Sequence, residues 1–368
     1  MISWPGASWF GALRRRFEAR IADADFQSRA ALHPVGRFFA RPQARALFDL
    51  CAGFTYSQTL MACERLQLFD QLQDHPQTLE ALATATATEP ARLRALLQGA
   101  TALRLLARTG DLYSIGSLGF ALLGNPGVRA MIRHHHVLYQ DLLEPTQLLT
   151  PSAGSSRLSE YWAYPETPAP DAQSVAQYSD LMAQSQRFIA EQVLAAVDFG
   201  SCKTVLDLGG GQGVFIEQLA QRYPHLQFIL FDLPPVIDRA RGYLRERGLL
   251  ERVRCVPGDL FRDALPQGAD LVSLVRVAHD HDTGPVSQLL SAVRALAPQR
   301  LLLAEPMAGA HAGGVEAYFS AYFLAMGQGQ LRTPAELTAL LGKAGFHSVR
   351  GAQTPIPMLA QVLIARPQ

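Results

Sequence analysis

A glycine-rich turn between a strand-like run and a helical run constrains this chain more than any other feature. The apolar run that ends at Leu208 leads directly into Gly209-Gly210-Gly211-Gln212-Gly213, and helical periodicity begins at Val214. Glycine lets the backbone turn sharply and lets a ligand approach without meeting a Cβ atom. The pattern indicates a nucleotide-binding turn at the carboxyl end of a strand, although dinucleotide-binding folds share it.

The chain around this turn alternates between short apolar runs and helical patterns. The runs are rich in Val, Ile and Leu and lack polar alternation, which is typical of strands buried on both faces. Helical spacing is clear at 214–223 and 286–296, and Thr333 begins a capping box whose helix ends at Gly345. This order predicts an α/β Rossmann-like domain with a doubly wound, mostly parallel sheet over residues 172–368. The expected strands are 204–208, 227–231, 253–256, 270–277, 300–305 and 359–365.

Carboxylates follow three successive strands beside the glycine turn. Asp207 lies at the end of the first strand, where it can face a cationic ligand, and Asp232 ends the second, where it can accept both ribose hydroxyls. Asp259 follows the third and could accept from an adenine amine. No basic residue follows the turn to offset a pyrophosphate, so we expect S-adenosylmethionine, with an NAD-dependent oxidoreductase as the alternative. The expected cofactor-binding residues here are Asp207, Gly209, Gly211, Gly213, Asp232, Leu233, Asp259, Leu260 and Phe261.

Residues 1–150 have a different character, and a turn-rich linker at 151–171 separates them from the later part of the chain. Apolar spacing predicts helices at about 43–69, 79–83 and 91–106, followed by a tight hairpin at 108–113. These elements predict a mainly helical, winged-helix-like domain. The helix at 91–106 carries only Arg92, Arg94 and Arg104 as basic residues. We therefore expect this domain to form a homodimer, and a cofactor-sensing DNA-binding regulator is the alternative.

Charge and cysteine content exclude further classes. The 33 basic and 32 acidic residues give no electrostatic reason to expect nucleic acid as a partner. None of the four cysteines forms a C-x-x-C pair, so neither a zinc site nor a disulfide framework is indicated. His134, His135 and His136 are consecutive and cannot all face one ion from a helix, so no metal is expected.

The cellular location of the protein is predicted from its apolar runs and from the N-terminal segment. No apolar run reaches the roughly 18 to 20 residues that span a bilayer. Trp4, Trp9 and Phe10 precede Arg14, Arg15 and Arg16, which reverses the charge order of a signal peptide. We expect a cytoplasmic protein; aromatic residues beside arginines leave peripheral contact with the inner membrane as an open alternative.

The motifs together resemble a known family, the O-methyltransferases that include the plant caffeate and flavonoid enzymes and many bacterial relatives. The resemblance covers most of the chain and implies a helical dimerisation domain followed by a Rossmann-like methyltransferase domain. The matching motifs are Leu206-Asp207-Leu208-Gly209-Gly210-Gly211, Phe231-Asp232-Leu233-Pro234, Gly258-Asp259-Leu260-Phe261, His279-Asp280, and Arg332-Thr333 to Ala344-Gly345-Phe346.

Other segments are similar to one group within that family, the acyclic carotenoid 1-hydroxyl O-methyltransferases of purple photosynthetic bacteria, of the hydroxyneurosporene or demethylspheroidene type. This resemblance implies methylation of the tertiary hydroxyl of a hydrophobic polyene in spheroidene and spirilloxanthin biosynthesis. Another large apolar acceptor, such as a bacteriochlorophyllide or a quinone-like phenol, is the alternative. The segments are those beginning at Gln43, Met131, Val137, Tyr178 and Leu274.

The resemblance also implies roles for residues after the later strands. His279 matches the family's general base, and Glu305 matches a glutamate that flanks it. Arg276 and Ser185 are expected to contact the cofactor. Two family positions differ here: Val275 replaces a lysine that precedes the histidine, and Leu331 replaces a second glutamate. These differences favour positioning of the acceptor over strong acid–base assistance.

Two apolar stripes match where the family builds its acceptor pocket. Residues at three- and four-residue spacing form one stripe between Glu305 and the capping box, and a second stripe precedes the methyltransferase domain. Plain core packing is the alternative for both. The expected substrate-binding residues are Tyr178, Met182, Phe319, Tyr322, Phe323 and Met326, and Tyr318 belongs to the same stripe.

Overall fold

The computed structural model describes residues 15–16, 18–150, 156–161, 172–309, 313–358 and 360–367, and only the backbone of 161 and 172–182. The chain forms two compact units, which divide between Gly119 and Phe120. That division falls earlier than the boundary expected at 150. The reason is that α8 (Pro126–Asp141) packs along α10 (Ala172–Ala196), and so belongs with the second unit.

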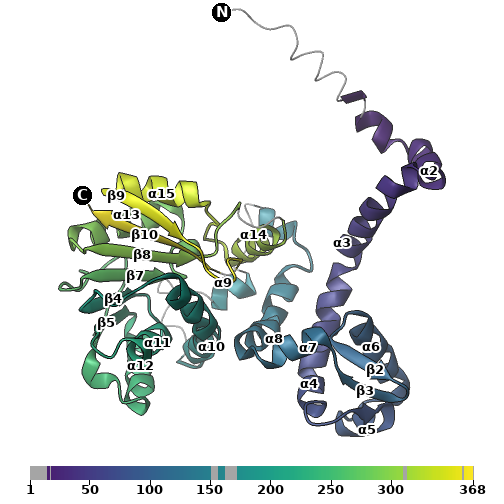
Figure 1. Cartoon of the computed structure of the whole chain (residues 1–368), viewed down its shortest axis with the longest axis horizontal. Coiled ribbons are helices and arrows are strands. Elements are labelled where there is room, and N and C mark those ends of the chain that lie inside the picture. The colour runs from purple at the N-terminus through teal and green to yellow at the C-terminus, as the bar shows by residue number, and fades with distance from the viewer. Residues whose placement is uncertain are drawn as a thin grey trace, which may run out of the picture. The chain divides into compact units, whose positions relative to one another are not determined.

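The first unit contains the elements of the expected winged helix (Figure 1). Its three strands form an antiparallel sheet in the order β1-β3-β2. Glu89 caps α6 by accepting hydrogen bonds from two backbone amides, and proline occupies the first turn. The elements are α2 (Ala24–Leu32), α3 (Gly36–Arg65), α4 (Leu68–Gln71), β1 (Gln77–Thr78), α5 (Leu79–Ala85), α6 (Pro90–Ala102), β2 (Leu106–Thr109), β3 (Leu112–Ile115) and α7 (Ser117–Leu123), which crosses into the second unit.

The apolar stripe predicted at 43–69 is only partly covered within the chain. The helix α3 begins earlier than expected, at Gly36, and ends at Arg65. Its C-terminal end packs into the unit, with Met61 3% exposed, whereas Leu50 is 80% and Phe54 70% exposed. A contiguous uncovered stripe of this kind marks an interaction surface.

The second unit is a seven-stranded sheet with helices on both faces (Figure 1). The strand order is β6-β5-β4-β7-β8-β10-β9, and the first five strands run parallel. The elements after α8 are a 3-10 turn (Gln147–Leu149), α9 (Arg157–Tyr161), α10, β4 (Thr204–Leu208), α11 (Val214–Arg222), β5 (Gln227–Asp232), α12 (Pro234–Glu246), a 3-10 turn (Leu250–Arg252), β6 (Val253–Pro257), β7 (Leu271–Val275), a 3-10 turn (Ala278–Asp280), α13 (Thr283–Ala295), β8 (Arg300–Glu305), α14 (Gly314–Met326), α15 (Pro334–Lys343), β9 (Phe346–Ala352) and β10 (Gln361–Pro367).

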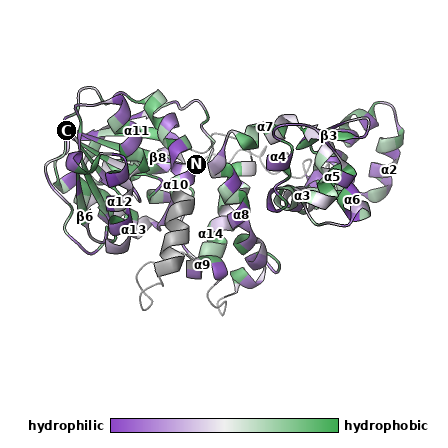
Figure 2. Ribbon diagram, turned by 90° about the horizontal axis from the view of Figure 1, so that it is seen from below, coloured by the Kyte–Doolittle hydropathy of each residue, from purple (hydrophilic) through white to green (hydrophobic). Residues whose placement is uncertain are grey.

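The core is two apolar layers, one on each face of this sheet. Successive strand residues point to opposite layers: Val205 packs with α10, α11 and α12, and Leu206 packs with α13 and α15. Figure 2 shows the hydrophobic colouring concentrated on the sheet interior. The double coverage explains why these strands lack polar alternation in the sequence.

The sequence-based account of the sheet is right for the parallel part and incomplete at one edge. The last strand, expected at 359–365, runs antiparallel to β8 as β10. It also pairs with β9, an edge strand that the sequence pattern did not indicate. The strand β9 lacks a continuous apolar run, because only its first residue, Phe346, is buried and the rest are exposed or half-buried.

Candidate active site

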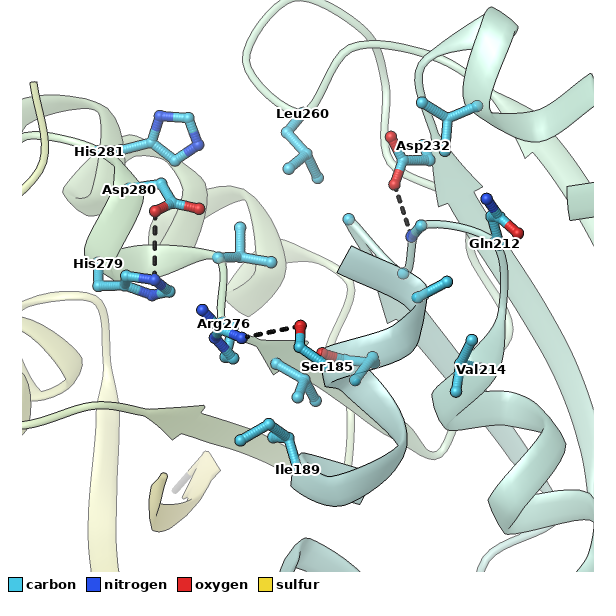
Figure 3. A pocket seen from close by; sticks show the side chains of 18 of the residues that line it. Ser185, Ile189, Gln212, Val214, Asp232, Leu260, Arg276, His279, Asp280 and His281 are labelled. Carbon is cyan, nitrogen blue, oxygen red and sulfur yellow. Dashed lines mark hydrogen bonds and ion pairs between the residues drawn. The ribbon is translucent and has the colours of Figure 1, made fainter. Parts of the chain in front are cut away.

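A cavity of about 690 Å³ lies at the carboxyl ends of β4, β5 and β7 (Figure 3). This size falls in the range of about 300–1,000 Å³ that is usual for small-molecule sites. The strand ends and the glycine turn form one side, and helices α8, α10 and α14 contribute the other. The edge where parallel strands end is where α/β sheets bind their ligands.

The glycine turn forms a close backbone wall. At Gly211 the backbone has φ +59, and an added Cβ would meet no atom within 4 Å, so this residue faces open space. At Gly210 an added Cβ would lie 2.4 Å from Asp207 Oδ2 and 2.5 Å from Leu230 Cδ1. A side chain at Gly210 would therefore force Asp207 and Leu230 to shift, which supports the expectation that the turn needs glycine.

Asp232 lies directly against this turn. Its Oδ2 accepts a hydrogen bond from the Gly211 amide at 2.8 Å, and its Oδ1 accepts from the Leu233 amide at 2.8 Å. Burial raises the pKa of Asp232 to about 6, and the two backbone hydrogen bonds oppose that rise. Both Asp232 and Leu233 line the cavity. The predicted placement of this carboxylate beside the turn is confirmed, and its contact with ribose stays a prediction.

Asp207 lies beneath the turn instead of on the cavity wall. Its Oδ1 accepts from the Ser273 hydroxyl at 2.6 Å, and its buried Oδ2 has no hydrogen-bond partner within the described chain. Burial raises the pKa of Asp207 to about 7; Ser273 opposes the rise and the nearby Asp232 charge adds to it. The sequence predicts that this carboxylate faces a ligand, but in the structure it supports the glycine turn and does not line the cavity. Gly213 likewise lies off the wall and caps α11.

The third strand end supplies an apolar and aromatic section of the wall. Asp259, Leu260 and Phe261 all line the cavity, and Asp259 Oδ1 accepts from the Phe261 amide at 2.8 Å. The Phe261 ring meets the His281 ring edge-on, with centroids 4.6 Å apart. Burial lowers the pKa of His281 to about 4, so this imidazole is neutral at physiological pH. The sequence argument missed His281 as a wall residue, although it follows the His279-Asp280 pair directly.

Two carboxylates flank the imidazole of His279, which is 5% exposed and lines the cavity. Its Nδ1 lies 2.5 Å from Glu305 Oε2, and its Nε2 lies 3.2 Å from Asp280 Oδ1 (Figure 3). The other oxygen of Glu305 accepts from the backbone amides of Val277 at 3.1 Å and Ala278 at 2.8 Å. Glu305 is thus fixed by the backbone, and it in turn fixes the ring of His279.

Arg276, which also lines the cavity, has an unusual backbone conformation. Arg276 has φ +58, a left-handed conformation that is costly for a residue with a side chain and is often found at functional sites. Its Nη1 lies 3.4 Å from Ser185 Oγ on α10, and both residues line the cavity. Burial raises the pKa of Asp280, and the charges of His279 and Arg276 oppose that rise. The structure brings Ser185 and Arg276 together on the cavity wall, and their contact with the cofactor stays a prediction.

A buried arginine holds the His279 turn from behind. Arg332 Nη1 donates to the Ala278 carbonyl and Nη2 to the His281 carbonyl, both at 2.8 Å. The backbone amide of Gln330 donates to the His279 carbonyl, also at 2.8 Å. The sequence does not reveal this role of Arg332, because contacts across some fifty residues leave no local pattern.

Helices α8 and α14 form the apolar part of the wall. Phe319, Tyr322 and Phe323 line the cavity, and the rings of Phe319 and Phe323 lie 6.0 and 5.8 Å from the His279 ring. Met326 is buried behind them in a core cluster. The side chains of Tyr178 and Met182 lie outside the described residues. Across the described chain no group of residues could hold a metal ion.

The class of protein follows from this arrangement and from comparison with known families. A model of the O-methyltransferase domain matches residues 158–347, and a model of the O-methyltransferase dimerisation domain matches residues 48–125. The chain therefore belongs to the O-methyltransferase family. It is an S-adenosylmethionine-dependent O-methyltransferase. This assignment rules out the alternatives of an NAD-dependent oxidoreductase and a DNA-binding regulator.

Curated relatives and solved structures narrow the position within the family. The chain is 39% identical to demethylspheroidene O-methyltransferase of Cereibacter sphaeroides, over 91% of this chain and 90% of the relative. It is 37% identical to the enzyme of that name from Rhodobacter capsulatus, over 90% and 84%. The solved structure of mitomycin 7-O-methyltransferase is 26% identical, with a TM-score of 0.73 over 89% of this chain and 99% of that one. Within the described residues, no helix is long and apolar enough to cross a membrane.

Proposed function

We propose that this enzyme transfers the methyl group of S-adenosylmethionine to the tertiary 1-hydroxyl of an acyclic carotenoid of the hydroxyneurosporene or demethylspheroidene type. The observation that carries the proposal is the pair of demethylspheroidene O-methyltransferases at 39% and 37% identity over about nine-tenths of the chain. Relatives named for other acceptors are less similar, such as the mitomycin biosynthesis 6-O-methyltransferase of Streptomyces lavendulae at 28% identity.

The residues around the glycine turn fit S-adenosylmethionine. The open space at Gly211 admits a ligand against the backbone, and the half-buried Asp232 carboxylate beside it can accept two hydroxyl groups. Leu260 and Phe261 can cover an adenine ring, which Asp259 can accept from. Arg276, held near Ser185, is placed to bind the carboxylate of the methionine portion. When bound, the cofactor supplies an electrophilic methyl group.

His279 is the residue proposed to take the proton of the acceptor hydroxyl. Glu305 accepts from Nδ1, so Nε2, which lies beside Asp280, is the ring nitrogen left for the acceptor. An acceptor hydroxyl that displaces the Asp280 carboxylate would donate its proton to the Nε2 lone pair, and Glu305 would stabilise the imidazolium that forms. Tertiary alcohols are weak acids, so the enclosure of the hydroxyl by the cavity wall supplies most of the rate through proximity.

The aromatic wall suits a long hydrophobic acceptor. Phe319, Tyr322 and Phe323 line the cavity, and the first and last of these rings lie close to His279. Polyene chains bind to such surfaces by apolar burial alone.

The proposed assembly is a homodimer that contacts the membrane surface peripherally. The family's dimerisation domain and the exposed apolar residues Leu47, Leu50 and Phe54 support a second copy as the partner. A membrane-dissolved polyene would reach a cytoplasmic enzyme most directly at the inner membrane. The aromatic residues proposed for that contact, Trp4, Trp9 and Phe10, lie outside the described residues.

A panel of acceptors tests the function. Purified enzyme is incubated with labelled S-adenosylmethionine and, separately, hydroxylated acyclic carotenoids, the parent carotenoids without the hydroxyl, bacteriochlorophyllides and simple phenols. Label should enter only the hydroxylated carotenoids and should appear as a methyl ether at the tertiary carbon. Preferential labelling of a chlorophyllide or a phenol would overturn the carotenoid assignment and leave the class of enzyme intact.

A further inference from the structure

One polar pair in the cavity wall has no part in the function described so far. His135 on α8 and Tyr318 on α14 both line the cavity, and His135 Nε2 lies 2.9 Å from the Tyr318 hydroxyl. Their ring centroids are 5.5 Å apart. The pair therefore joins the two helices across the acceptor side of the cavity.

Neither member of this pair is charged at physiological pH. Burial lowers the pKa of His135 to about 4. Burial raises the pKa of Tyr318 to about 12, although the positive charge of Arg276 opposes that rise. Such a histidine is too weak a base to carry away the acceptor's proton, so the pair offers hydrogen bonding without acid–base chemistry.

A neutral polar pair in the cavity wall disfavours the binding of a hydrocarbon, because the hydrocarbon displaces water from the polar groups. The neighbours of Tyr318 are aromatic, with Phe319 5.1 Å and Tyr322 5.8 Å away between ring centroids. A polyene lying over the pair would remove water from the Tyr318 hydroxyl and supply no hydrogen bond in return, which disfavours binding. A single hydroxyl group on the polyene removes that cost if it meets Tyr318.

We propose that Tyr318 binds the acceptor oxygen and that His135 positions Tyr318 for this contact, so that the pair selects hydroxylated acceptors; this rests on the proposed carotenoid function. Nε2–H of His135 donates to the Tyr318 oxygen, and the Tyr318 hydroxyl donates to one lone pair of the acceptor oxygen. The acceptor's own proton remains available to His279, and its second lone pair remains free to attack the methyl group.

The test measures binding selectivity without turnover. The dissociation constants of a 1-hydroxylated acyclic carotenoid and of its parent hydrocarbon are measured by fluorescence quenching in the presence of S-adenosylhomocysteine. Wild-type enzyme should prefer the hydroxylated compound. Tyr318→Phe keeps the ring and should reduce that preference about threefold to tenfold, which is the range for one hydrogen bond. Its affinity for S-adenosylhomocysteine should stay the same.

Three further variants separate positioning from general damage. His135→Leu should reduce the preference as Tyr318→Phe does, and His135→Gln, which retains a donor, should restore part of it. Tyr139→Phe is the matched control, because this ring lies 6.2 Å from His135 but is not on the cavity wall, and it should keep the preference.

The outcomes distinguish the two proposals. A full preference in Tyr318→Phe, beside a wild-type enzyme that methylates the hydroxylated carotenoid, overturns the role of the pair alone. A wild-type enzyme that binds the two carotenoids equally and methylates neither overturns both. Equal loss in Tyr139→Phe would show that the effect is packing and would also reject the proposal.

Discussion

Replacing Glu305 by glutamine tests the proposed proton-accepting group most directly. The carboxylate holds three hydrogen bonds: two from the backbone amides of Val277 and Ala278 and one from His279 Nδ1. Glutamine has the same shape and one oxygen that can still accept from the two amides. Its NH2 group would then face Nδ1, so His279 must present an unprotonated Nδ1 and carry its proton on Nε2. That tautomer cannot accept a proton from the acceptor hydroxyl.

The expected loss can be bounded from these contacts. A hydrogen bond to a charged group contributes about 1.5–3 kcal/mol, and positioned general bases contribute about 10²- to 10⁴-fold. Leu331 occupies the position of the family's second glutamate, so no carboxylate at that position can take over the role of Glu305. The weak acidity of a tertiary alcohol favours the lower end. We expect kcat to fall about 100-fold in Glu305→Gln, which corresponds to an activation free energy higher by about 2.7 kcal/mol. We expect about the same decrease of kcat in His279→Ala.

The assay compares kcat at saturating substrates with the affinity for S-adenosylhomocysteine measured by calorimetry, which should change less than about twofold. Nitrogen NMR of His279 should report the exchanged tautomer. Glu336→Gln is the charge-matched control, since this exposed capping-box residue lies in α15 and a glutamine preserves the cap. A Glu305→Gln enzyme with nearly normal kcat would refute the assigned role of His279.

Two further predictions concern the carboxylates at the glycine turn. Because the pKa of Asp232 is raised to about 6, cofactor binding should tighten as pH rises from about 5 to 7 and this residue ionises; Asp232→Asn should bind about 10- to 100-fold more weakly and show no such pH dependence by calorimetry. The folded-state pKa of Asp207 is raised to about 7, so the stabilising effect of its protonation is present below about pH 4 and is lost as pH rises through about 7. Asp207→Asn should therefore unfold at a higher urea concentration than wild type at pH 8, with a free energy of unfolding larger by up to about 4 kcal/mol. This difference in the free energy of unfolding should vanish near pH 4. A constant difference between pH 4 and pH 8 would contradict the assigned cause.

The sheet and its cofactor edge could be predicted because their causes are local. Strand 204–208, the glycine turn and the helix from Val214 follow one another directly, and each has its own signal. The edge strand β9 could not be predicted, because its pairing depends on β10, whose direction depends in turn on β8. The exposure of Leu50 and Phe54 shows the same limit: helical spacing reveals an apolar stripe but not what covers it.

The site was predicted where residues follow strand ends and missed where distant segments meet. Asp232, Leu260, Phe261 and His279 line the cavity as strand order implied. Arg332 was given no role, because its contacts come from residues about fifty positions earlier.

The antiparallel strand β10 has a consequence for how the site comes into being. Gln361 lies opposite Glu305 in the register between β10 and β8, and β9 joins the sheet only through β10. On the ribosome, β8 is an open edge until residues 361–367 emerge, long after His279 and the glycine turn have been made. An open edge is a template for wrong pairing. The nascent enzyme thus carries Glu305 at the end of an unpaired edge strand, and the late strand β10 pairs with that edge and protects it.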